Sequence, residues 1–411
     1  MKNKSLPSEV DGHIQAPPSK SAAQRAIAIA GLAAGTSVIT RPGEADDVMA
    51  AAEICRTLGA SVEQKSGNLH IKGGIHPPAV PLHCRESGLS IRMFAGIASI
   101  FSEEVQMTGQ GSLLKRPMEV VAASLQALGV HCKTTAGKLP LYIRGPIKGG
   151  KVSIDGSLSS QVLTGILIAA PYAKKELTLH VSQLKSKPYI DLTMDVMKAF
   201  GVETINEDHQ RFTIPPGQFY KACRFTVEGD WSGAAFLLVA GAIAGKVVVN
   251  NLNPGSFQGD KRILDALKAS GAMVNVTGEG IRVENNKLNA FSFDATDCPD
   301  LFPPLAALAA HCHGTSRISG VSRLRAKESD RAATLMDIFS KMGIFIRLEQ
   351  DTMLVEGGKP QAATVESHGD HRIAMAAAVT ALNATGPVHI EGAEAVNKSY
   401  PGFFNDLANI T

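Results

Sequence analysis

The hydrophobic pattern of the chain is dominated by six almost wholly apolar runs, each of helix length and each preceded by a short polar segment. Apolar runs without a polar face are typical of buried helices. A helix start presents unpaired N–H groups and a partial positive charge, so it favours anions. We therefore expect six buried helices whose starts can hold charged small molecules. The runs are 26–34, 93–101, 162–173, 234–244, 301–310 and 373–382, and the polar segments are 18–25, 86–92, 157–161, 228–230, 297–300 and 370–372.

A second set of helices is predicted by a glycine signature that recurs about every 70 residues. In each copy a glycine, which tolerates the left-handed conformation, follows an amphipathic stretch and precedes a strand. Charged residues precede each stretch, and Pro117 and Pro188 suit a first helical turn because their missing N–H costs nothing there. A sixth copy begins at 398–401. The five glycines are Gly59, Gly129, Gly201, Gly271 and Gly343.

Together the two helix families predict one repeating unit: strand, apolar helix, strand, amphipathic helix and a strand pair. Six such units divide into two groups of three, with a break near 225–229. The apolar helices should be buried inside each group and the amphipathic ones should cover it. This is an α/β or α+β architecture with two similar domains, which also suits a length of 411 residues.

Composition narrows the class of protein. Apolar residues make up 44% of the chain and charged residues 19%, as in a soluble globular protein. The formal charge of +3 is too small to indicate nucleic acid or an acidic membrane as partner. Segment 1–12 is polar, the apolar runs are too short to span a bilayer, and the six cysteines are scattered. We expect a cytoplasmic protein without disulfides, membrane contact or nucleic-acid partner.

Eight short motifs, spread over the chain in a fixed order, resemble those of the enolpyruvyl transferase family. The resemblance is closest to the branch that acts on shikimate 3-phosphate. No single motif is decisive, whereas eight in the family's order are very specific. They are Pro18-Ser19-Lys20-Ser21 with Arg25, Arg116-Pro117-Met118, Ser159-Ser160-Gln161, 186–191 (SKPYID), 228–230 (EGD), 258–260 (QGD), 325–331 (RAKESDR) and 370–375 (DHRIAM).

The resemblance implies two lobes, each an inside-out α/β barrel of three units, with the active site in the cleft between them. The lobes would be 19–228, on the shikimate 3-phosphate side, and 1–18 plus 229–411, on the phosphoenolpyruvate side, with a double crossover. The implied reaction moves the carboxyvinyl group of phosphoenolpyruvate to the 5-hydroxyl of shikimate 3-phosphate by addition and elimination, and releases phosphate. This is a step in aromatic amino acid (chorismate) biosynthesis. A monomer without metal or organic cofactor is implied.

The resemblance also implies roles for individual residues, and cations suit substrates that carry two phosphates and two carboxylates between them. Asp300 is the candidate base towards the 5-hydroxyl, while Glu328 and Lys20 would exchange protons with the methylene and the leaving phosphate. Gly88 and Arg323 lie in further substrate-contact segments. The residues implied to hold phosphoenolpyruvate are Lys20, Arg116, Gln161, Arg331, Arg372 and Lys398. Those implied to hold shikimate 3-phosphate are Ser21, Arg25, Ser159, Ser160, Ser186, Tyr189 and Lys327.

Two segments depart from the commonest family pattern. The usual N-x-G-T reads Glu86-Ser87-Gly88-Leu89, and Arg323 stands where an asparagine is usual. A carboxylate beside an anion site is repulsive unless it is paired. Because one change adds a negative charge and the other a positive one, we hypothesise that Glu86 and Arg323 compensate each other.

Two other functions stay open as alternatives. Enolpyruvyl transfer to UDP-N-acetylglucosamine is the activity of a sister family that carries a loop cysteine shortly before its R-P segment, and 111–116 contains no thiol. A non-catalytic anion- or RNA-binding protein of the same fold would need clustered basic residues interleaved with aromatics, which make up only 5% of the chain. His311 and His313 could suggest a metal, but no third ligand is evident.

Overall fold

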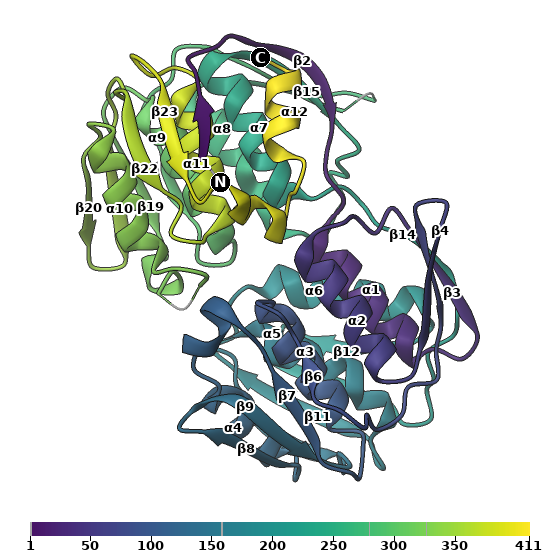
Figure 1. Cartoon of the computed structure of the whole chain (residues 1–411). Coiled ribbons are helices and arrows are strands. Elements are labelled where there is room, and N and C mark those ends of the chain that lie inside the picture. The colour runs from purple at the N-terminus through teal and green to yellow at the C-terminus, as the bar shows by residue number, and fades with distance from the viewer. Residues whose placement is uncertain (1, 158, 279, 326) are drawn as a thin grey trace. The chain divides into compact units, whose positions relative to one another are not determined.

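The computed structural model describes residues 2–157, 159–278, 280–325 and 327–411. Leu158, in the polar segment 157–161, and Ala326, in the motif 325–331, lie outside the described residues. The chain forms two compact units (Figure 1). We call Pro18–Val227 lobe I, and Met1–Pro17 together with Glu228–Thr411 lobe II. The expected division differs from this one by a single residue at each crossing.

Lobe I follows the predicted order of strand, helix, strand, helix and strand pair. Its elements are α1 (Lys20–Leu32), β3 (Thr36–Thr40), α2 (Asp46–Thr57), β4 (Ser61–Lys65), β5 (Asn68–Lys72), β6 (Leu82–His83), α3 (Gly88–Ala98), β7 (Val105–Thr108), α4 (Glu119–Ala127), β8 (His131–Thr135), β9 (Lys138–Arg144), β10 (Gly150–Asp155), α5 (Ser160–Ala169), β11 (Leu177–Ser182), α6 (Lys187–Ala199), β12 (Ile205–Glu207), β13 (Arg211–Ile214) and β14 (Arg224–Thr226). Short helical turns lie at Gly111–Lys115 and Ala170–Tyr172.

Lobe II repeats the same order. Its elements are β1 (Lys2–Ser5), β2 (Val10–Gln15), α7 (Trp231–Ala244), β15 (Gly245–Asn250), α8 (Ile263–Ser270), β16 (Met273–Val276), β17 (Ile281–Glu284), β18 (Ser292–Asp294), α9 (Phe302–Ala310), β19 (Thr315–Ser319), α10 (Arg331–Lys341), β20 (Ile346–Glu349), β21 (Thr352–Glu356), β22 (Ala363–Glu366), α11 (His371–Ala381), β23 (Val388–Glu391) and α12 (Phe403–Asn409). Short helical turns lie at Gly259–Arg262, Pro299–Leu301, Val321–Arg323 and Ala393–Lys398.

The sheets follow one plan. In each unit the leading strand pairs in parallel with the strand that follows the apolar helix. The strand pair then joins this second strand in antiparallel orientation. Two leading strands are exchanged between the lobes. Strand β2 pairs in parallel with β15 of lobe II, and β14 pairs in parallel with β3 of lobe I. This is the double crossover that the resemblance implies. Among the described residues the sheet orders are β14-β3-β5-β4, β6-β7-β9-β8 and β10-β11-β13-β12 in lobe I, and β16-β17-β15-β2, β18-β19-β21-β20 and β1-β23-β22 in lobe II.

The last unit is completed by the start of the chain. Strand β1 runs antiparallel to β23, the position that the strand pair occupies in the other units. Figure 1 shows this purple strand beside the yellow β23. The amino-terminal segment therefore belongs to lobe II twice over, through β1 and through β2.

The predicted apolar helices form the core of each lobe. Helices α1, α3 and α5 are buried almost throughout in lobe I, as are α7, α9 and α11 in lobe II. Helices α3 and α5 approach most closely at two glycines, because a Cβ on Gly96 would lie 2.2 Å from the carbonyl carbon of Gly165. The predicted two-domain α/β fold is confirmed, with the apolar helices inside.

Most of the predicted helix ends are also confirmed. The five signature glycines all adopt positive φ angles, from 74° at Gly343 to 97° at Gly59. Pro188 lies in the first turn of α6, as predicted. The prediction for Pro117 is wrong, because α4 begins only at Glu119 and Met118 is its N-cap. Arg116 is the C-cap of the turn Gly111–Lys115, and Pro117 follows it before the N-cap of α4.

Two properties of the whole chain follow. Across the described ranges, the structure contains no helix that is both long and apolar enough to cross a membrane. All six cysteines are free thiols, and all but Cys223 are buried.

Candidate active site

In lobe I, the starts of the buried helices are tied together by side chains. The amide nitrogen of Gln24, in α1, donates to the hydroxyls of Ser87 (2.8 Å) and Ser90 (3.0 Å) at the start of α3. The ammonium of Lys20, the first residue of α1, pairs with Asp47 of α2 at 3.0 Å. The helix starts of the first two units therefore lie at one site, as an anion-binding region requires.

Two arginines, Arg92 and Arg116, extend this site towards α5. Arg92 donates from Nη1 to the side-chain oxygen of Gln161 at 2.9 Å and to the carbonyl oxygen of Gly88 at 3.0 Å. The second guanidinium, that of Arg116, packs directly over Gly88, because a Cβ added there would lie 2.4 Å from its Nη1. A side chain at position 88 would therefore displace the guanidinium of Arg116. The structure brings three of the implied substrate residues together here.

Arg25 is held differently from the expectation. Its side chain is 1% exposed. It donates to the hydroxyls of Thr193 (2.9 Å) and Thr164 (3.4 Å) and to the carbonyl oxygens of Ser21 (2.8 Å) and Tyr189 (3.3 Å). Burial lowers its pKa to about 10. Most of its donors are engaged by neutral acceptors, so Arg25 ties α1 to α5 and α6 as well as lying beside the predicted shikimate 3-phosphate residues.

The remaining predicted residues of lobe I lie at the starts of α5 and α6. Ser159 caps α5, its hydroxyl accepting from the backbone N–H of Gln161 at 3.3 Å, and Ser160 is the buried first residue of that helix. Ser186 precedes α6 with a left-handed φ of 55°. Tyr189, half-buried in the first turn of α6, offers its carbonyl oxygen to Arg25. Both helix starts are therefore rich in hydroxyl groups.

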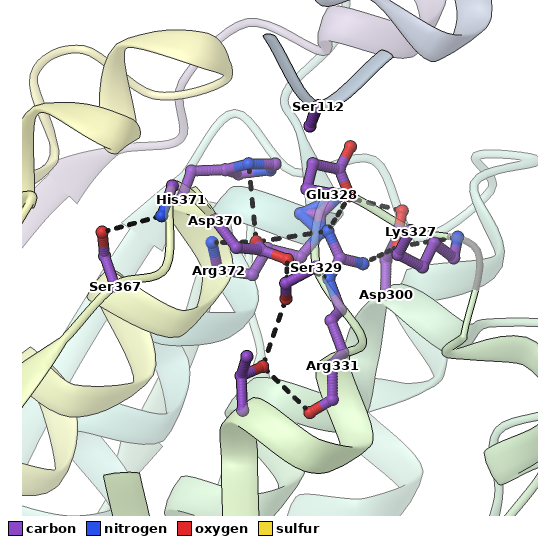
Figure 2. Close-up of polar contacts among 12 residues, drawn as sticks. Ser112, Asp300, Lys327, Glu328, Ser329, Arg331, Ser367, Asp370, His371 and Arg372 are labelled. Atoms are coloured by element: carbon purple, nitrogen blue, oxygen red, sulfur yellow. Dashed lines mark hydrogen bonds and ion pairs between the residues drawn. The ribbon is translucent and has the colours of Figure 1, made fainter. Parts of the chain in front are cut away.

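In lobe II, a single arginine gathers three carboxylates (Figure 2). Arg331, the first residue of α10, is 1% exposed. It donates to Asp300 at 2.7 Å, to Asp370 at 2.8 Å and to Glu328. Burial alone lowers the pKa of Arg331, but Asp370, Glu328 and Asp300 together raise it above its ordinary value. Its donors are occupied by protein groups, so its implied grip on phosphoenolpyruvate would require it to exchange partners.

Asp300 lies at the centre of the cations of this lobe. Lys327 donates to it at 3.1 Å, Arg331 at 2.7 Å and Arg372 at 2.9 Å. Burial raises the pKa of Asp300, but Arg372, Lys327 and Arg331 together hold it well below its usual range. Asp300 is therefore a carboxylate at neutral pH, which is the form that a proton acceptor needs.

Arg372 has two donor nitrogens that no described residue of the chain accepts from. It lies in the first turn of α11 and is 4% exposed. Its Nη2 donates to Asp300, whereas Nε and Nη1 have no hydrogen-bond partner among the residues that the structure describes. Buried guanidinium donors without partners are costly, and an oxyanion satisfies them in pairs. Arg372 is the clearest anion-binding group of lobe II.

Sequence reasoning missed the carboxylates that hold these cations. Asp370, fully buried, accepts from Arg331 and from the hydroxyl of Ser329 (3.1 Å) and caps α11 through the N–H of Arg372 (3.0 Å). Asp260 is also fully buried, and the hydroxyl of Ser232 donates to it. Burial and the nearby Asp300 raise the pKa of Asp260 to about 6, against the effect of Arg372. Two of the motifs contained Asp260 and Asp370, but the side chains that bind them, Ser232 and Arg331, lie far away in sequence.

The two departures from the family pattern each have a neighbour within their own lobe. Glu86 accepts from the hydroxyl of Ser112 at 3.0 Å. Burial lowers the pKa of Arg323, while Asp297 and Asp300 oppose that effect. The compensation of Glu86 by Arg323 stays a hypothesis. Lys398 lies at the end of the turn Ala393–Lys398 and is 7% exposed.

His311 and His313 are the two histidines that could suggest a metal. Within the described part of the chain, no three His, Cys, Asp or Glu side chains are grouped so that they could hold a metal ion. His311 is half-buried, and its Nε2 lies 3.2 Å from the carbonyl oxygen of Thr380. Burial lowers the pKa of His311 to about 4. The ring of His311 therefore contacts the backbone of α11.

Comparison with known proteins identifies the family. Residues 5–407 match the family model described as EPSP synthase (3-phosphoshikimate 1-carboxyvinyltransferase). A 3-phosphoshikimate 1-carboxyvinyltransferase from Thermococcus kodakarensis is 41% identical over 406 residues, covering 98% of each chain. One from Clostridium kluyveri is 36% identical over 408 residues, covering 98% of this chain and 96% of that one. The solved EPSP synthase from Acinetobacter baumannii superimposes with a TM-score of 0.84 at 30% identity, covering 100% of this chain and 98% of that one. The resemblance drawn from the eight motifs is confirmed.

Proposed function

This chain belongs to the EPSP synthase family, and we propose that it transfers the carboxyvinyl group of phosphoenolpyruvate to the 5-hydroxyl of shikimate 3-phosphate, releasing phosphate. The reaction is a step of aromatic amino acid biosynthesis. The observation that carries the proposal is the family match over residues 5–407, joined to an ionised Asp300 among three cations. The relatives named above carry the activity in their names.

The anionic groups of the two substrates would be held by the cations of both lobes. In lobe I, Arg116 over Gly88 and the pair of Arg92 with Gln161 offer donors beside the starts of α3 and α5. In lobe II, the unused Nε and Nη1 of Arg372 suit one phosphate or carboxylate. Lys20, Arg331 and Lys398 are proposed to assist. We propose that both clusters serve the same reaction.

The hydroxyl-rich side of lobe I suits shikimate 3-phosphate. The starts of α5 and α6 offer N–H groups and serine hydroxyls, which can donate to a phosphate without the bulk of a long side chain. Ser21 and Arg25 lie beside the start of α6, because Arg25 donates to the carbonyl oxygens of both Ser21 and Tyr189. In lobe II, Lys327 and Arg323 would add positive charge. The residues proposed for this substrate at these helix starts are Ser159, Ser160, Ser186 and Tyr189.

Asp300 is the proposed base that takes the proton of the 5-hydroxyl. Three cations make it a weak base in the ligand-free protein, because they stabilise its ionised form. Substrate phosphates and carboxylates would draw donors of Arg372 and Lys327 to themselves. The pKa of Asp300 would then rise, so substrate binding itself would activate the base.

The methylene carbon of phosphoenolpyruvate must gain a proton in the addition and lose one in the elimination. Glu328 and Lys20 are the proposed groups. Glu328 lies in an ion pair with Arg331, which stabilises a carboxylate, so in this form it suits proton removal. Lys20 lies against Asp47 at 3.0 Å and carries donors for the leaving phosphate. Glu328→Gln should therefore lower turnover sharply while substrate binding is largely kept.

Localisation and assembly form the next part of the proposal. We propose a cytoplasmic monomer that binds small molecules and no nucleic acid. The net charge of +3, the low aromatic content and the free thiols support this choice.

One assay tests the reaction and its alternatives. Phosphate release from phosphoenolpyruvate is measured with shikimate 3-phosphate, with UDP-N-acetylglucosamine and with neither acceptor. We expect release only with shikimate 3-phosphate, and the Asp300→Asn variant serves as the control for chemistry at this site. Release with UDP-N-acetylglucosamine would support the sister activity, and none with either acceptor would refute both enzymatic functions.

A further inference from the structure

The carboxylate of Glu86 connects two loops of lobe I. It accepts from the hydroxyl of Ser112 at 3.0 Å and from the backbone N–H of Ser112 at 3.4 Å. Ser112 belongs to the short turn Gly111–Lys115. A half-buried carboxylate that accepts two donors from one turn restricts the position of that turn. Glu86 thus fixes the segment that leads directly into Arg116.

Glycine at position 111 fits the carboxylate of Glu86 in a specific way. Gly111 has a left-handed φ of 55°, and a Cβ there would lie 2.0 Å from Oε1 of Glu86. The carboxylate therefore occupies the space that any other residue at 111 would fill. This close fit makes the turn and the carboxylate one packed unit.

The backbone on the Glu86 side is itself rigid. Arg85 adopts a left-handed φ of 48°, a costly conformation for a residue with a side chain. Two contacts compensate: the guanidinium of Arg85 binds both oxygens of Glu53, at 3.0 and 2.5 Å, and its carbonyl oxygen accepts from the N–H of Gln110 at 2.8 Å. Glu86 therefore acts from an anchored position.

The chain of contacts closes at Arg116. The N–H of Arg116 donates to the carbonyl oxygen of Leu113 at 3.2 Å, at the end of the turn. Its guanidinium then packs over Gly88, two residues after Glu86. The contacts therefore form a closed loop: Glu86 binds Ser112, the turn of Ser112 leads to Arg116, and Arg116 packs over Gly88 near Glu86. A shift of the turn would move the guanidinium away from Gly88.

We propose that Glu86 is a positioning residue, which sets the guanidinium of Arg116 for phosphoenolpyruvate by fixing the turn Gly111–Lys115. The proposal rests on the proposed function of Arg116. It gives the departure from the usual asparagine a purpose: a carboxylate that accepts two hydrogen bonds from Ser112 within the protein.

Steady-state kinetics with three variants test this. Glu86→Ala should raise the KM for phosphoenolpyruvate about tenfold while kcat changes less, because a charge-assisted tie is lost away from the reacting atoms. Glu86→Gln keeps an oxygen that accepts from Ser112, so it should restore most of the lost affinity. Ser112→Ala should shift the KM in the same direction as Glu86→Ala, by a smaller factor. The exposed Glu103→Ala is the matched control.

Two outcomes would overturn the proposal. The first is a KM that stays unchanged in Glu86→Ala. The second is a KM that rises in Glu86→Ala but stays unchanged in Ser112→Ala. The second outcome would mean that the charge of Glu86 acts on the ligand directly. A second measurement does not depend on turnover. Hydrogen exchange at the N–H of Ser112 should quicken in Glu86→Ala and not in the control. Inactive wild-type protein with the expected exchange result would refute the proposed function alone.

A double-variant comparison sharpens the structural part. Gly111→Ala should weaken phosphoenolpyruvate binding strongly in the wild-type background, since its Cβ would meet the carboxylate of Glu86. In the Glu86→Ala background the same change should cost several-fold less, because only the left-handed backbone cost remains. Equal losses in both backgrounds would contradict the contact.

Discussion

The two lobes share one repeating unit but hold their arginines in opposite ways. In lobe I, Arg25 and Arg92 are bound by hydroxyls, carbonyl oxygens and the amide of Gln161. In lobe II, Arg331 and Arg372 are bound by carboxylates. The partners described for these arginines are therefore neutral in lobe I and charged in lobe II.

This difference separates two tasks that the proposed reaction requires. Neutral acceptors orient a guanidinium without cancelling its charge, which favours the binding of anions. Carboxylates cancel the charge but add groups that can accept protons. Lobe I is thus built mainly for binding, whereas lobe II combines binding through Arg372 with proton transfer through Asp300.

The largest effect is expected at Asp300. Asp300→Asn removes the proposed base and leaves a neutral oxygen for Lys327, Arg331 and Arg372. We expect kcat to fall by a factor of about 10² to 10⁴, the usual contribution of general base catalysis. Rapid-quench or phosphate-release kinetics at saturating substrates measure it. A fall of less than about threefold would remove Asp300 from the chemistry and weaken the contrast between the lobes.

The second effect concerns the stability of the two kinds of arginine site. Asp370→Ala removes a buried carboxylate from Arg331 and should lower the free energy of unfolding by about 3 kcal/mol. Thr193→Val removes one neutral acceptor from Arg25 and should cost about 1 kcal/mol. Urea unfolding of both variants measures the difference. Equal costs would mean that the carboxylates of lobe II matter no more for stability than the hydroxyls of lobe I.

More of the fold than of the candidate site could be predicted from the sequence. Apolar runs and signature glycines each report on a local segment, so the helices and the six-unit repeat followed from them. The partners Asp47, Asp370 and Gln24 could not be predicted, because each binds a residue that the fold brings from another segment. The prediction for Pro117 failed because Pro117 lies between the turn Gly111–Lys115 and α4, and that turn contacts Glu86, a residue distant in sequence.

A third difference between the lobes is the pH dependence of the free energy of unfolding. The pKa of Asp260 is raised to about 6 by burial and by Asp300. The folded state therefore binds more protons than the unfolded state between about pH 4 and pH 6, and stability falls as pH rises through this window. Asp260→Asn should remove a fall on the order of 2 kcal/mol.

Urea unfolding at several pH values between 4 and 7 measures this third effect. The exposed Asp208→Asn in lobe I is the control and should leave the pH dependence as in the wild type. Asp300 contributes with the opposite sign and at lower pH, because its pKa is depressed: its stabilising effect is lost as pH falls. An identical pH dependence in Asp260→Asn and wild type would contradict the raised pKa.

The smallest effect tests the comparison by giving lobe I the chemistry of lobe II. Gln161→Glu places a carboxylate 2.9 Å from Nη1 of Arg92 without changing the shape of the side chain. The new ion pair would cancel positive charge where phosphoenolpyruvate is proposed to bind, so its KM should rise about tenfold, equivalent to about 1.4 kcal/mol. The increase should shrink at pH values near the pKa of the new glutamate, where it becomes protonated. If the KM stays unchanged at neutral pH, the neutral acceptors of lobe I do not preserve charge for the substrate, and the contrast between the lobes has a structural meaning only.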